Sequence, residues 1–181
     1  MIANTTGNID VVALSPAVGA EIRDVDLAEP LNDDLFATIY HAWLDHGVLR
    51  FRDQQLSDLD LVAFSHRFGD LDLAPVKGHG QAVVEGIPEL FVISNVIEKG
   101  LPIGSLGHSE LFWHTDMAYT DMPPKASCLY SLIVPTFGGE TGYIDMHAAY
   151  DSLPTYLKNR IKGRTIKHDS VYTLDGYLRD D

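Results

Sequence analysis

Cysteine is almost absent from the sequence, which has only Cys128 among its 181 residues. An internal disulfide is therefore excluded. We expect Cys128, in the apolar run ASCLYSLIV, to be a small buried hydrophobic residue rather than a reactive thiol.

Basic residues are also scarce, because 13 Lys and Arg stand against 26 Asp and Glu and give a formal net charge of −13. Such an acidic surface repels phosphate backbones and anionic lipids, so we expect neither nucleic-acid nor membrane partners.

The sequence also lacks long apolar runs, internal repeats and low-complexity segments. Its first residues, MIANTTGNIDVV, have no basic patch and no apolar core. We therefore predict no signal peptide, no membrane span and a cytoplasmic location. The length and the 45% apolar content are typical of one globular domain with a core of its own.

The first seventy residues show clear local patterns. Residues 10–27 predict two short strands around a Ser-Pro-Ala turn. A helix is predicted from the N-cap Asn32 to a stop at Gly47, because apolar residues recur between them at helical spacing. The run VLRF at 48–51 predicts a strand. Residues 57–69 open with a Ser-x-x-Asp capping box and predict a second helix that ends at Gly69.

Strand patterns dominate from residue 88 onward. We predict strands at 90–96, 111–120, 125–134 and 140–146, and an active-site loop or lid at the Gly-rich residues 97–110. Consecutive strands of this kind favour an α+β fold with an antiparallel sheet or barrel over alternating βαβ units.

Two short helices are predicted near the C-terminal end of the sequence. The first begins at Asp145 or Met146. Pro154 fits the first turn of the second helix, and Gly163 fits its stop.

His114 and Asp116 stand one residue apart in the sequence WHTD. If they lie on a strand, their side chains project to the same face. An imidazole nitrogen and a carboxylate oxygen can then share one metal ion, as two of the three ligands in the two-His-one-carboxylate triad of non-haem Fe(II). Such a mixed set suits iron better than a structural zinc ion. The alternative is a histidine that is hydrogen-bonded to a nearby acid.

Several further motifs accompany the His-x-Asp pair in a fixed order. In chain order they are RFGDL at 67–71, the aromatic residue Tyr119, Pro123-Pro124, the turn Gly138-Gly139-Glu140-Thr141, AAYDSLP at 148–154 and the stretch from Gly163 to His168-Asp169. Together with WHTD, this set resembles the taurine dioxygenase/2,4-dichlorophenoxyacetate dioxygenase (TauD/TfdA) family of Fe(II)- and 2-oxoglutarate-dependent dioxygenases. The resemblance covers nearly the whole chain.

The resemblance implies a single domain over residues 1–181 with a double-stranded β-helix, or jelly roll, and flanking helices. It implies that His114 and Asp116 bind iron and that Thr141 donates its hydroxyl to a carboxylate of 2-oxoglutarate. An ordinary strand threonine is the alternative for Thr141. The implied reaction uses Fe(II), 2-oxoglutarate and O2 to hydroxylate an unactivated C–H bond, and it yields succinate and CO2.

Two residues of the family pattern have no counterpart that we can place. These are the third iron ligand, a late histidine, and the arginine that anchors 2-oxoglutarate. The histidines after Asp116 are only His147 and His168, and neither matches the ligand position. We therefore expect the domain to be incomplete, with the second half of the jelly roll missing. Without the arginine, the chain alone should hold its cosubstrate poorly.

The substrate is expected to be a small organic molecule that bears a carboxylate or an amine. Ala74, Lys77 and Glu110 replace the residues that bind taurine in the family, so taurine is not the expected substrate. Lys77 could pair with an anion and Glu110 with an amine, although solvated charges are the alternative for both. Asn95 and Met117 could line the pocket, and a core methionine is the alternative for Met117. For partners other than the substrate, a homo-oligomer is one expected possibility.

Two other classes of protein compete with the oxygenase. One is a degenerate homologue without catalytic activity that serves as a binding or interaction module. The other is a different cupin-type metalloprotein, against which the Gly-Gly-Glu-Thr turn argues.

Overall fold

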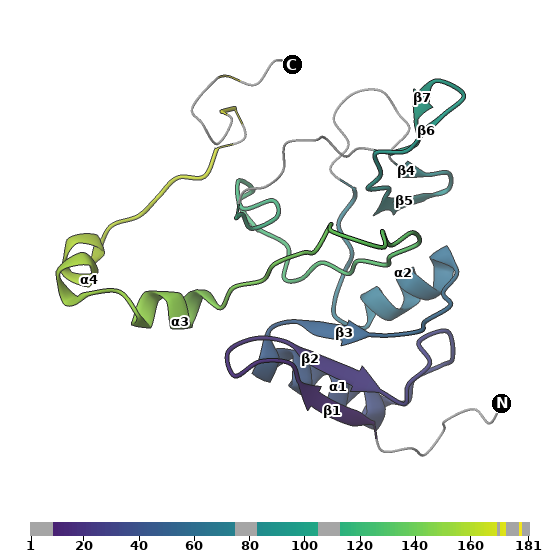
Figure 1. Ribbon diagram of the computed structural model, residues 1–181, viewed down its shortest axis with the longest axis horizontal. Coiled ribbons are helices and arrows are strands. Elements are labelled where there is room, and N and C mark those ends of the chain that lie inside the picture. Colours follow the sequence, from purple (N-terminus) through teal and green to yellow (C-terminus); the bar gives the residue numbers. More distant parts are fainter. Residues whose placement is uncertain (1–8, 75–82, 105–112, 170, 173–177, 179–181) are drawn as a thin grey trace. The chain divides into compact units, whose positions relative to one another are not determined.

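The computed structural model describes residues 9–74, 83–104, 113–169, 171, 172 and 178. These residues are mixed helix and sheet (Figure 1). The elements are β1 (Asp10–Ala13), β2 (Ala20–Arg23), α1 (Asp33–His46), β3 (Leu49–Phe51), α2 (Asp58–His66), β4 (Val83–Val84), β5 (Ile87–Phe91), β6 (Ile97–Glu98), β7 (Leu101–Pro102), α3 (Met146–Asp151) and α4 (Thr155–Ile161). The chain divides into two compact units, residues 1–69 with 130–163 and residues 70–129 with 164–181.

The first unit contains a three-stranded sheet in the order β1-β2-β3. β1 and β2 are antiparallel, with Ala13 opposite Ala20, and β2 and β3 are parallel, with Ala20 beside Leu49. All three strands were predicted. Helix α1 makes the crossover that the two parallel strands need, so β2, α1 and β3 form one βαβ unit in the first unit of the chain.

Helix α1 begins and ends where the sequence predicts. The side chain of Asn32 accepts a hydrogen bond from the backbone N–H of Leu35 at 2.8 Å, and the N–H of Gly47 donates to the carbonyl of Trp43 at 2.8 Å. Both ends of the helix therefore satisfy backbone groups that have no partner inside it. Ile39, on the apolar face of α1, is completely buried.

The core of the first unit lies between α1, α2 and the sheet. Its buried residues are Ile22, Leu27, Ile39, Ala42 and Phe64. A cluster of aromatic rings adjoins it, with Phe68 in edge contact with Phe36, Trp43 and Phe64. These contacts bury one face of α1 against the strands (Figure 1).

Helix α2 opens with the predicted capping box. Asp60 N–H donates to Ser57 Oγ at 3.2 Å, and Ser57 N–H donates to Asp60 Oδ2 at 2.8 Å. Hydrogen bonds from the side chain and backbone of Ser57 lower the pKa of Asp60. The helix ends at His66 rather than Gly69, because the next three N–H groups bond to carbonyls only three residues back.

Arg67 ties the end of α2 to the start of α1. Its Nη1 donates to the Leu31 carbonyl at 2.8 Å, and its Nη2 donates to Asp33 Oδ1 at 2.9 Å. The guanidinium carbon lies 4.4 Å from the centre of the Phe36 ring, within the range of a cation–π contact. The arginine of the RFGDL motif therefore has a structural role.

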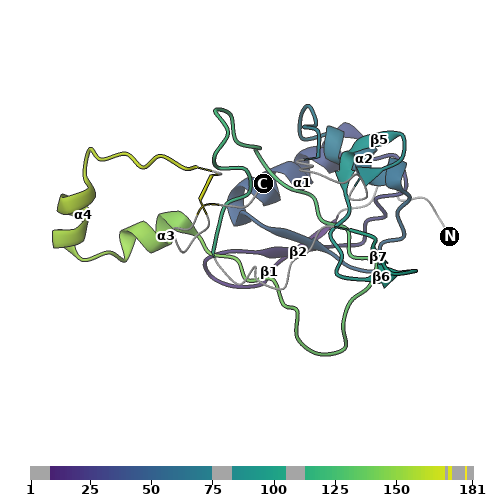
Figure 2. The ribbon, with the colours of Figure 1, turned by 90° about the horizontal axis from the view of Figure 1, so that it is seen from above.

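The second unit contains two small antiparallel sheets, β4-β5 and β6-β7. β5 overlaps only the start of the strand predicted at 90–96. The predicted loop at 97–110 begins as a hairpin, in which β6 and β7 lie side by side in both views (Figures 1 and 2). Its two-residue turn has positive φ at Lys99 and Gly100, as a tight hairpin turn requires. Residues 105–110 of the predicted loop lie outside the described residues.

Residues 113–145 carry no strand, so the strands predicted within 111–120, 125–134 and 140–146 are wrong for the described residues. A strand needs a hydrogen-bonded neighbour, and no described segment pairs with these residues. Apolar side chains in this stretch are exposed as a result, including Leu132 at 81%, Ile133 at 82% and Phe137 at 95%. Cys128 is also exposed, so the expectation that it is buried is wrong.

Tyr130 anchors part of this stretch within the first unit. Its hydroxyl donates to the Gln54 carbonyl at 3.2 Å and accepts from the Leu56 N–H at 3.2 Å. The four other tyrosines of the stretch and of the helices that follow are exposed. They are Tyr119, Tyr143, Tyr150 and Tyr156.

The two C-terminal helices form as predicted. Asp145 caps α3 and accepts from the N–H groups of His147 and Ala148 at 2.8 and 3.2 Å. Pro154 stands at the N-cap of α4, one residue before its predicted place. Neither helix has a buried residue. No helix within the described ranges is long and apolar enough to cross a membrane.

Candidate metal site

His114 and Asp116 lie together in the second unit. His114 Nε2 is 3.2 Å from Asp116 Oδ1, and the two side chains are 51% and 60% exposed. The two side chains lie together, but they do so from a turn and not from the predicted strand. Residues 113–115 have no regular structure, and Asp116–Tyr119 form the turn.

The turn that begins at Asp116 is strained and held by local hydrogen bonds. Met117 has φ of 49°, in the left-handed region that side chains other than glycine rarely adopt. Its carbonyl accepts from both the N–H and the hydroxyl of Thr120, at 3.0 and 2.9 Å. Such strained residues gather at functional sites, where surrounding contacts hold them. Met117 is half-buried.

Ser127 contacts the other oxygen of the Asp116 carboxylate. Its hydroxyl donates to Asp116 Oδ2 at 3.2 Å, across eleven residues of sequence. The carboxylate therefore has a different neighbour at each oxygen, the His114 ring at Oδ1 and the Ser127 hydroxyl at Oδ2.

The donor set of this pair fits a divalent metal ion. Two ligand atoms, each about 2.1 Å from one ion and at a right angle, lie about 3.0 Å apart. The 3.2 Å between His114 Nε2 and Asp116 Oδ1 is close to that separation. Half-exposed nitrogen and oxygen donors leave room for further ligands. In the described part of the chain, no third His, Cys, Asp or Glu completes a cluster with the pair.

Thr141 belongs to the first unit, whereas the His-x-Asp pair belongs to the second. The preceding Gly138 and Gly139 have φ of 75° and 77°, so the predicted tight turn is present and needs glycine at both positions. Thr141 itself is exposed. Its role toward 2-oxoglutarate stays a prediction.

The structure tests the other substrate candidates only in part. Asn95 follows β5 and is exposed. Lys77 and Glu110 lie outside the described residues. The predictions for all three as pocket residues stay predictions.

The sequence of this chain matches the model of a known protein family. The model described as "Taurine catabolism dioxygenase TauD, TfdA family" matches residues 10–179. The chain belongs to the TauD/TfdA family. This is the family that the WHTD and Gly-Gly-Glu-Thr motifs predict. Its dioxygenases depend on 2-oxoglutarate (α-ketoglutarate), and the cofactors expected from the sequence, Fe(II), 2-oxoglutarate and O2, follow from the family.

Two curated TauD/TfdA relatives are similar over almost all of the chain. An alkylsulfatase of Acinetobacter baylyi is 32% identical over 176 residues, which are 97% of this chain and 51% of the relative. An (S)-phenoxypropionate/α-ketoglutarate dioxygenase of Sphingobium herbicidovorans is 31% identical over 91% of this chain and 54% of the relative. The chain thus spans about half the length of the curated relatives it matches.

A solved TauD/TfdA structure has the same fold over the shared region. It is a putative α-ketoglutarate-dependent taurine dioxygenase from Burkholderia xenovorans, 37% identical, with a TM-score of 0.71. The match covers 86% of this chain and 52% of that chain.

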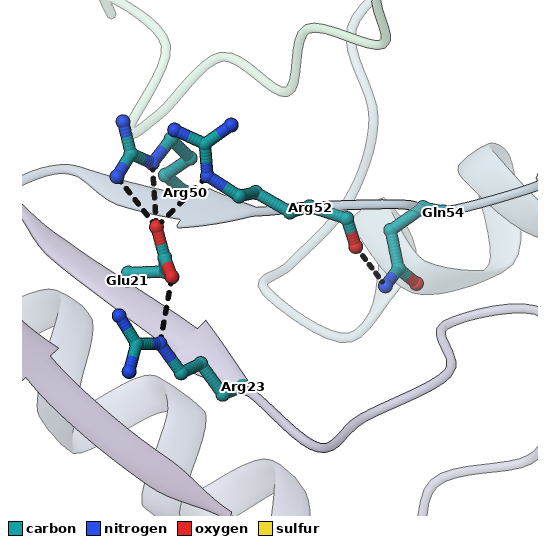
Figure 3. Close-up of polar contacts among 5 residues, drawn as sticks. All are labelled: Glu21, Arg23, Arg50, Arg52 and Gln54. Atoms are coloured by element: carbon teal, nitrogen blue, oxygen red, sulfur yellow. Dashed lines mark hydrogen bonds and ion pairs between the residues drawn. The ribbon is translucent and has the colours of Figure 1, made fainter.

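Outside the TauD/TfdA motifs, sequence reasoning missed a cluster of charges on the sheet of the first unit. The buried carboxylate of Glu21 accepts from Arg23 Nε at 2.7 Å, from Arg52 Nε at 3.0 Å, and from Nε and Nη2 of Arg50 (Figure 3). These hydrogen bonds lower the pKa of Glu21 to about 2. A signal was present, because charged residues alternate with apolar ones in both GAEIR and VLRFR. Glu21 lies opposite Arg50 in the register of β2 and β3.

A cavity of about 280 Å³ adjoins this cluster. Its lining residues all lie between Glu21 and Gln54, and none of the site residues predicted from the sequence is among them. The Glu21 carboxylate is already occupied by three guanidinium groups. We therefore assign the cluster to the stability of the sheet rather than to the reaction.

Ser127 is the second residue that sequence reasoning missed, in this case near the site itself. It stands eleven residues after Asp116, inside the run ASCLYSLIV that was interpreted as a central strand. No spacing rule connects two residues so far apart across a loop. Only the structure identifies this contact.

Proposed function

We propose that this chain carries two of the iron ligands of an Fe(II)- and 2-oxoglutarate-dependent oxygenase. The reaction hydroxylates a C–H bond of a small organic anion and gives succinate and CO2. The observation that carries the proposal is the pairing of His114 Nε2 with Asp116 Oδ1 at 3.2 Å, in a family of 2-oxoglutarate-dependent dioxygenases.

In this proposal His114 and Asp116 hold the metal ion. Nε2 must be free of a proton to bind the ion, so the neutral ring carries its proton on Nδ1. Asp116 supplies an anionic oxygen on the same side as Nε2. Bound Fe(II) would supply the redox and oxygen chemistry that these side chains cannot perform.

Thr141 is proposed to donate its hydroxyl to a carboxylate of 2-oxoglutarate. The tight turn at Gly138 and Gly139 supports this role, because it brings backbone and a short hydroxyl within reach of an anion. The third iron ligand and the anchoring arginine are proposed to come from outside the described residues. A single domain with the jelly roll of the family is the proposed fold of the complete protein.

The names of the relatives support an anionic substrate. One is an alkylsulfatase and another acts on phenoxypropionate, so a sulfate ester or a carboxylate is involved in each case. Lys77 is the proposed partner for the anionic group of the substrate. Asn95, Met117 and Glu110 are proposed to line the same pocket, and Met117 is the one of the three in the turn next to Asp116.

Succinate formation tests the proposal. The complete protein, which in this proposal includes the third iron ligand and the anchoring arginine, is incubated with Fe(II), 2-oxoglutarate, O2 and either an alkyl sulfate or phenoxypropionate, and succinate is measured. We expect His114→Ala and Asp116→Ala to reduce succinate to background, because each removes one ligand of the ion. His147→Ala is the matched control, since His147 is exposed at the start of α3, and it should keep the wild-type rate. Unchanged turnover in either ligand variant contradicts the iron assignment.

A binding module without catalytic activity is the second candidate. It is favoured by the absence of a third ligand from the described part of the chain. In that case wild-type protein forms no succinate with any of these compounds, but it still binds one of them.

A further inference from the structure

We propose that Ser127 is a positioning residue that sets the orientation of the Asp116 carboxylate toward the metal ion. The inference rests on the proposed function, because it gives Ser127 a role at the ion that His114 and Asp116 hold. Ser127 does not touch the ion in this account. It acts through Asp116, by holding Oδ2 so that Oδ1 alone faces the ion.

The argument begins with the two oxygens of Asp116. Oδ1 lies 3.2 Å from His114 Nε2, and Oδ2 lies 3.2 Å from Ser127 Oγ. A carboxylate turns easily about its last bond when nothing holds it, since that torsion has broad minima. A hydroxyl donor at one oxygen restricts this rotation and favours the orientation in which the other oxygen faces the histidine.

The path of the chain explains why the serine returns to this point. After Asp116 the left-handed Met117 reverses the backbone, and Thr120 holds that reversal through two hydrogen bonds to the Met117 carbonyl. The Pro123-Pro124 pair then restricts the backbone before Ser127. The contact of Ser127 with Asp116 closes this loop.

The length of the contact suits alignment rather than tight binding. At 3.2 Å it is longer than an ordinary O–H···O hydrogen bond of about 2.7 Å. The carboxylate therefore keeps some freedom to adjust as the ion binds. Partners of this kind, one contact away from a metal ion, orient its ligands, and their loss typically weakens metal binding about 10- to 100-fold.

The consequence concerns the number of coordination positions that Asp116 occupies. A carboxylate that binds through both oxygens takes two positions on the ion, and one that binds through a single oxygen takes one. Sites of the His-carboxylate type keep positions open for other ligands. By engaging Oδ2, Ser127 keeps one such position free.

Cobalt binding tests the inference, because Co(II) is coloured and its visible spectrum reports the ligands around it. The full 181-residue chain is titrated with Co(II) as wild type, Ser127→Ala, Ser127→Thr and Ser131→Ala. Ser131 is the matched control, as an exposed serine in the same run without a hydrogen bond among the described residues. Ser127 is exposed as well, so its replacement removes no core packing.

We expect Ser127→Ala to bind Co(II) about 10-fold more weakly and with a changed visible spectrum. Ser127→Thr keeps the hydroxyl and should restore both properties, and Ser131→Ala should change neither. An unchanged affinity or an unchanged spectrum in Ser127→Ala overturns the inference, and so does an equal loss in Ser131→Ala.

His114→Ala, titrated in parallel, separates this inference from the proposed function. If wild type and His114→Ala bind Co(II) equally, the proposed site is wrong and the role of Ser127 fails with it. If His114→Ala loses binding while Ser127→Ala matches the wild type, only the role of Ser127 is wrong.

Discussion

Glu21 and Asp116 are both carboxylates, and their neighbours give them different roles. Glu21 is buried on the sheet, and both oxygens of its carboxylate accept hydrogen bonds from the guanidinium groups of Arg23, Arg50 and Arg52. Asp116 is 60% exposed, with a histidine nitrogen at one oxygen and a hydroxyl at the other. The first arrangement stabilises the fold, and the second leaves an anionic oxygen available to a metal ion.

The effect of pH on stability should depend on Glu21. Its pKa is about 2 in the folded chain against an ordinary value of 4.5, and the hydrogen bond from Arg23 is the largest cause. A lowered pKa means that the carboxylate stabilises the fold fully above about pH 4.5, and that this contribution is lost as pH falls toward about 2. Glu21→Gln removes it. We therefore expect urea unfolding to show a steeper loss of stability in the wild type than in Glu21→Gln, from about pH 5 to about pH 3.

A parallel loss of stability in the two proteins over that range would contradict the role given to the arginine cluster. Glu29→Gln is a suitable control, because Glu29 is exposed, lies outside the sheet and has no hydrogen bond or ion pair among the described residues. It should retain the wild-type slope.

At the scale of residues, the sequence predicts only those contacts of the site that join residues close together in the chain. His114 and Asp116 are two residues apart, so the separation of their backbones is short in any conformation and a local pattern is enough to predict a pair. Ser127 and the partners of Glu21 come from distant parts of the chain. Their positions depend on tertiary structure, which no local spacing rule describes.

At the scale of elements, the helices are better predicted than the strands for the same reason. Helix signals are caps and periodic apolar residues, and all their hydrogen bonds are local. Asn32 and Ser57 cap helices as predicted, and Asp145 caps the helix that was predicted to begin at Asp145 or Met146. A strand needs a partner from elsewhere, and the apolar run at 125–134 has no such partner among the described residues. Strand propensity alone is therefore insufficient there.

The N-cap of α1 gives a direct test at this scale. Asn32→Ala removes the side-chain oxygen that accepts from Leu35, and we expect a loss of about 1 kcal/mol in the free energy of unfolding. Asn32→Asp keeps an oxygen at the same place and should retain the wild-type stability. Urea unfolding measures both variants. If Asn32→Ala and Asn32→Asp have equal unfolding midpoints, the cap does not stabilise the chain.

At the scale of the whole molecule, the chain matches about half the length of its curated relatives, and part of its apolar surface is uncovered. Leu132, Ile133, Val134 and Phe137 are all exposed within six residues of sequence. Contiguous apolar surface of this kind favours association in water. The chain on its own should therefore associate as its concentration rises.

Light scattering after size-exclusion chromatography checks this expectation. The wild type should show a mass that increases with concentration, and the double variant Leu132→Ser/Ile133→Ser should show less association. Leu59→Ser is the control, because Leu59 is an exposed leucine on α2 and does not belong to this run of sequence. A wild-type chain that stays monomeric at all concentrations would rule out association through the run.

Binding of Fe(II) to the chain tests the central claim, that His114 and Asp116 share one metal ion. Equilibrium dialysis without oxygen measures how much Fe(II) the wild type, His114→Ala, Asp116→Ala and His147→Ala retain. The account predicts about one Fe(II) per wild-type chain and the same for His147→Ala, with binding about 10-fold weaker or worse in the two ligand variants. Equal retention of Fe(II) by the wild type and both ligand variants would contradict it.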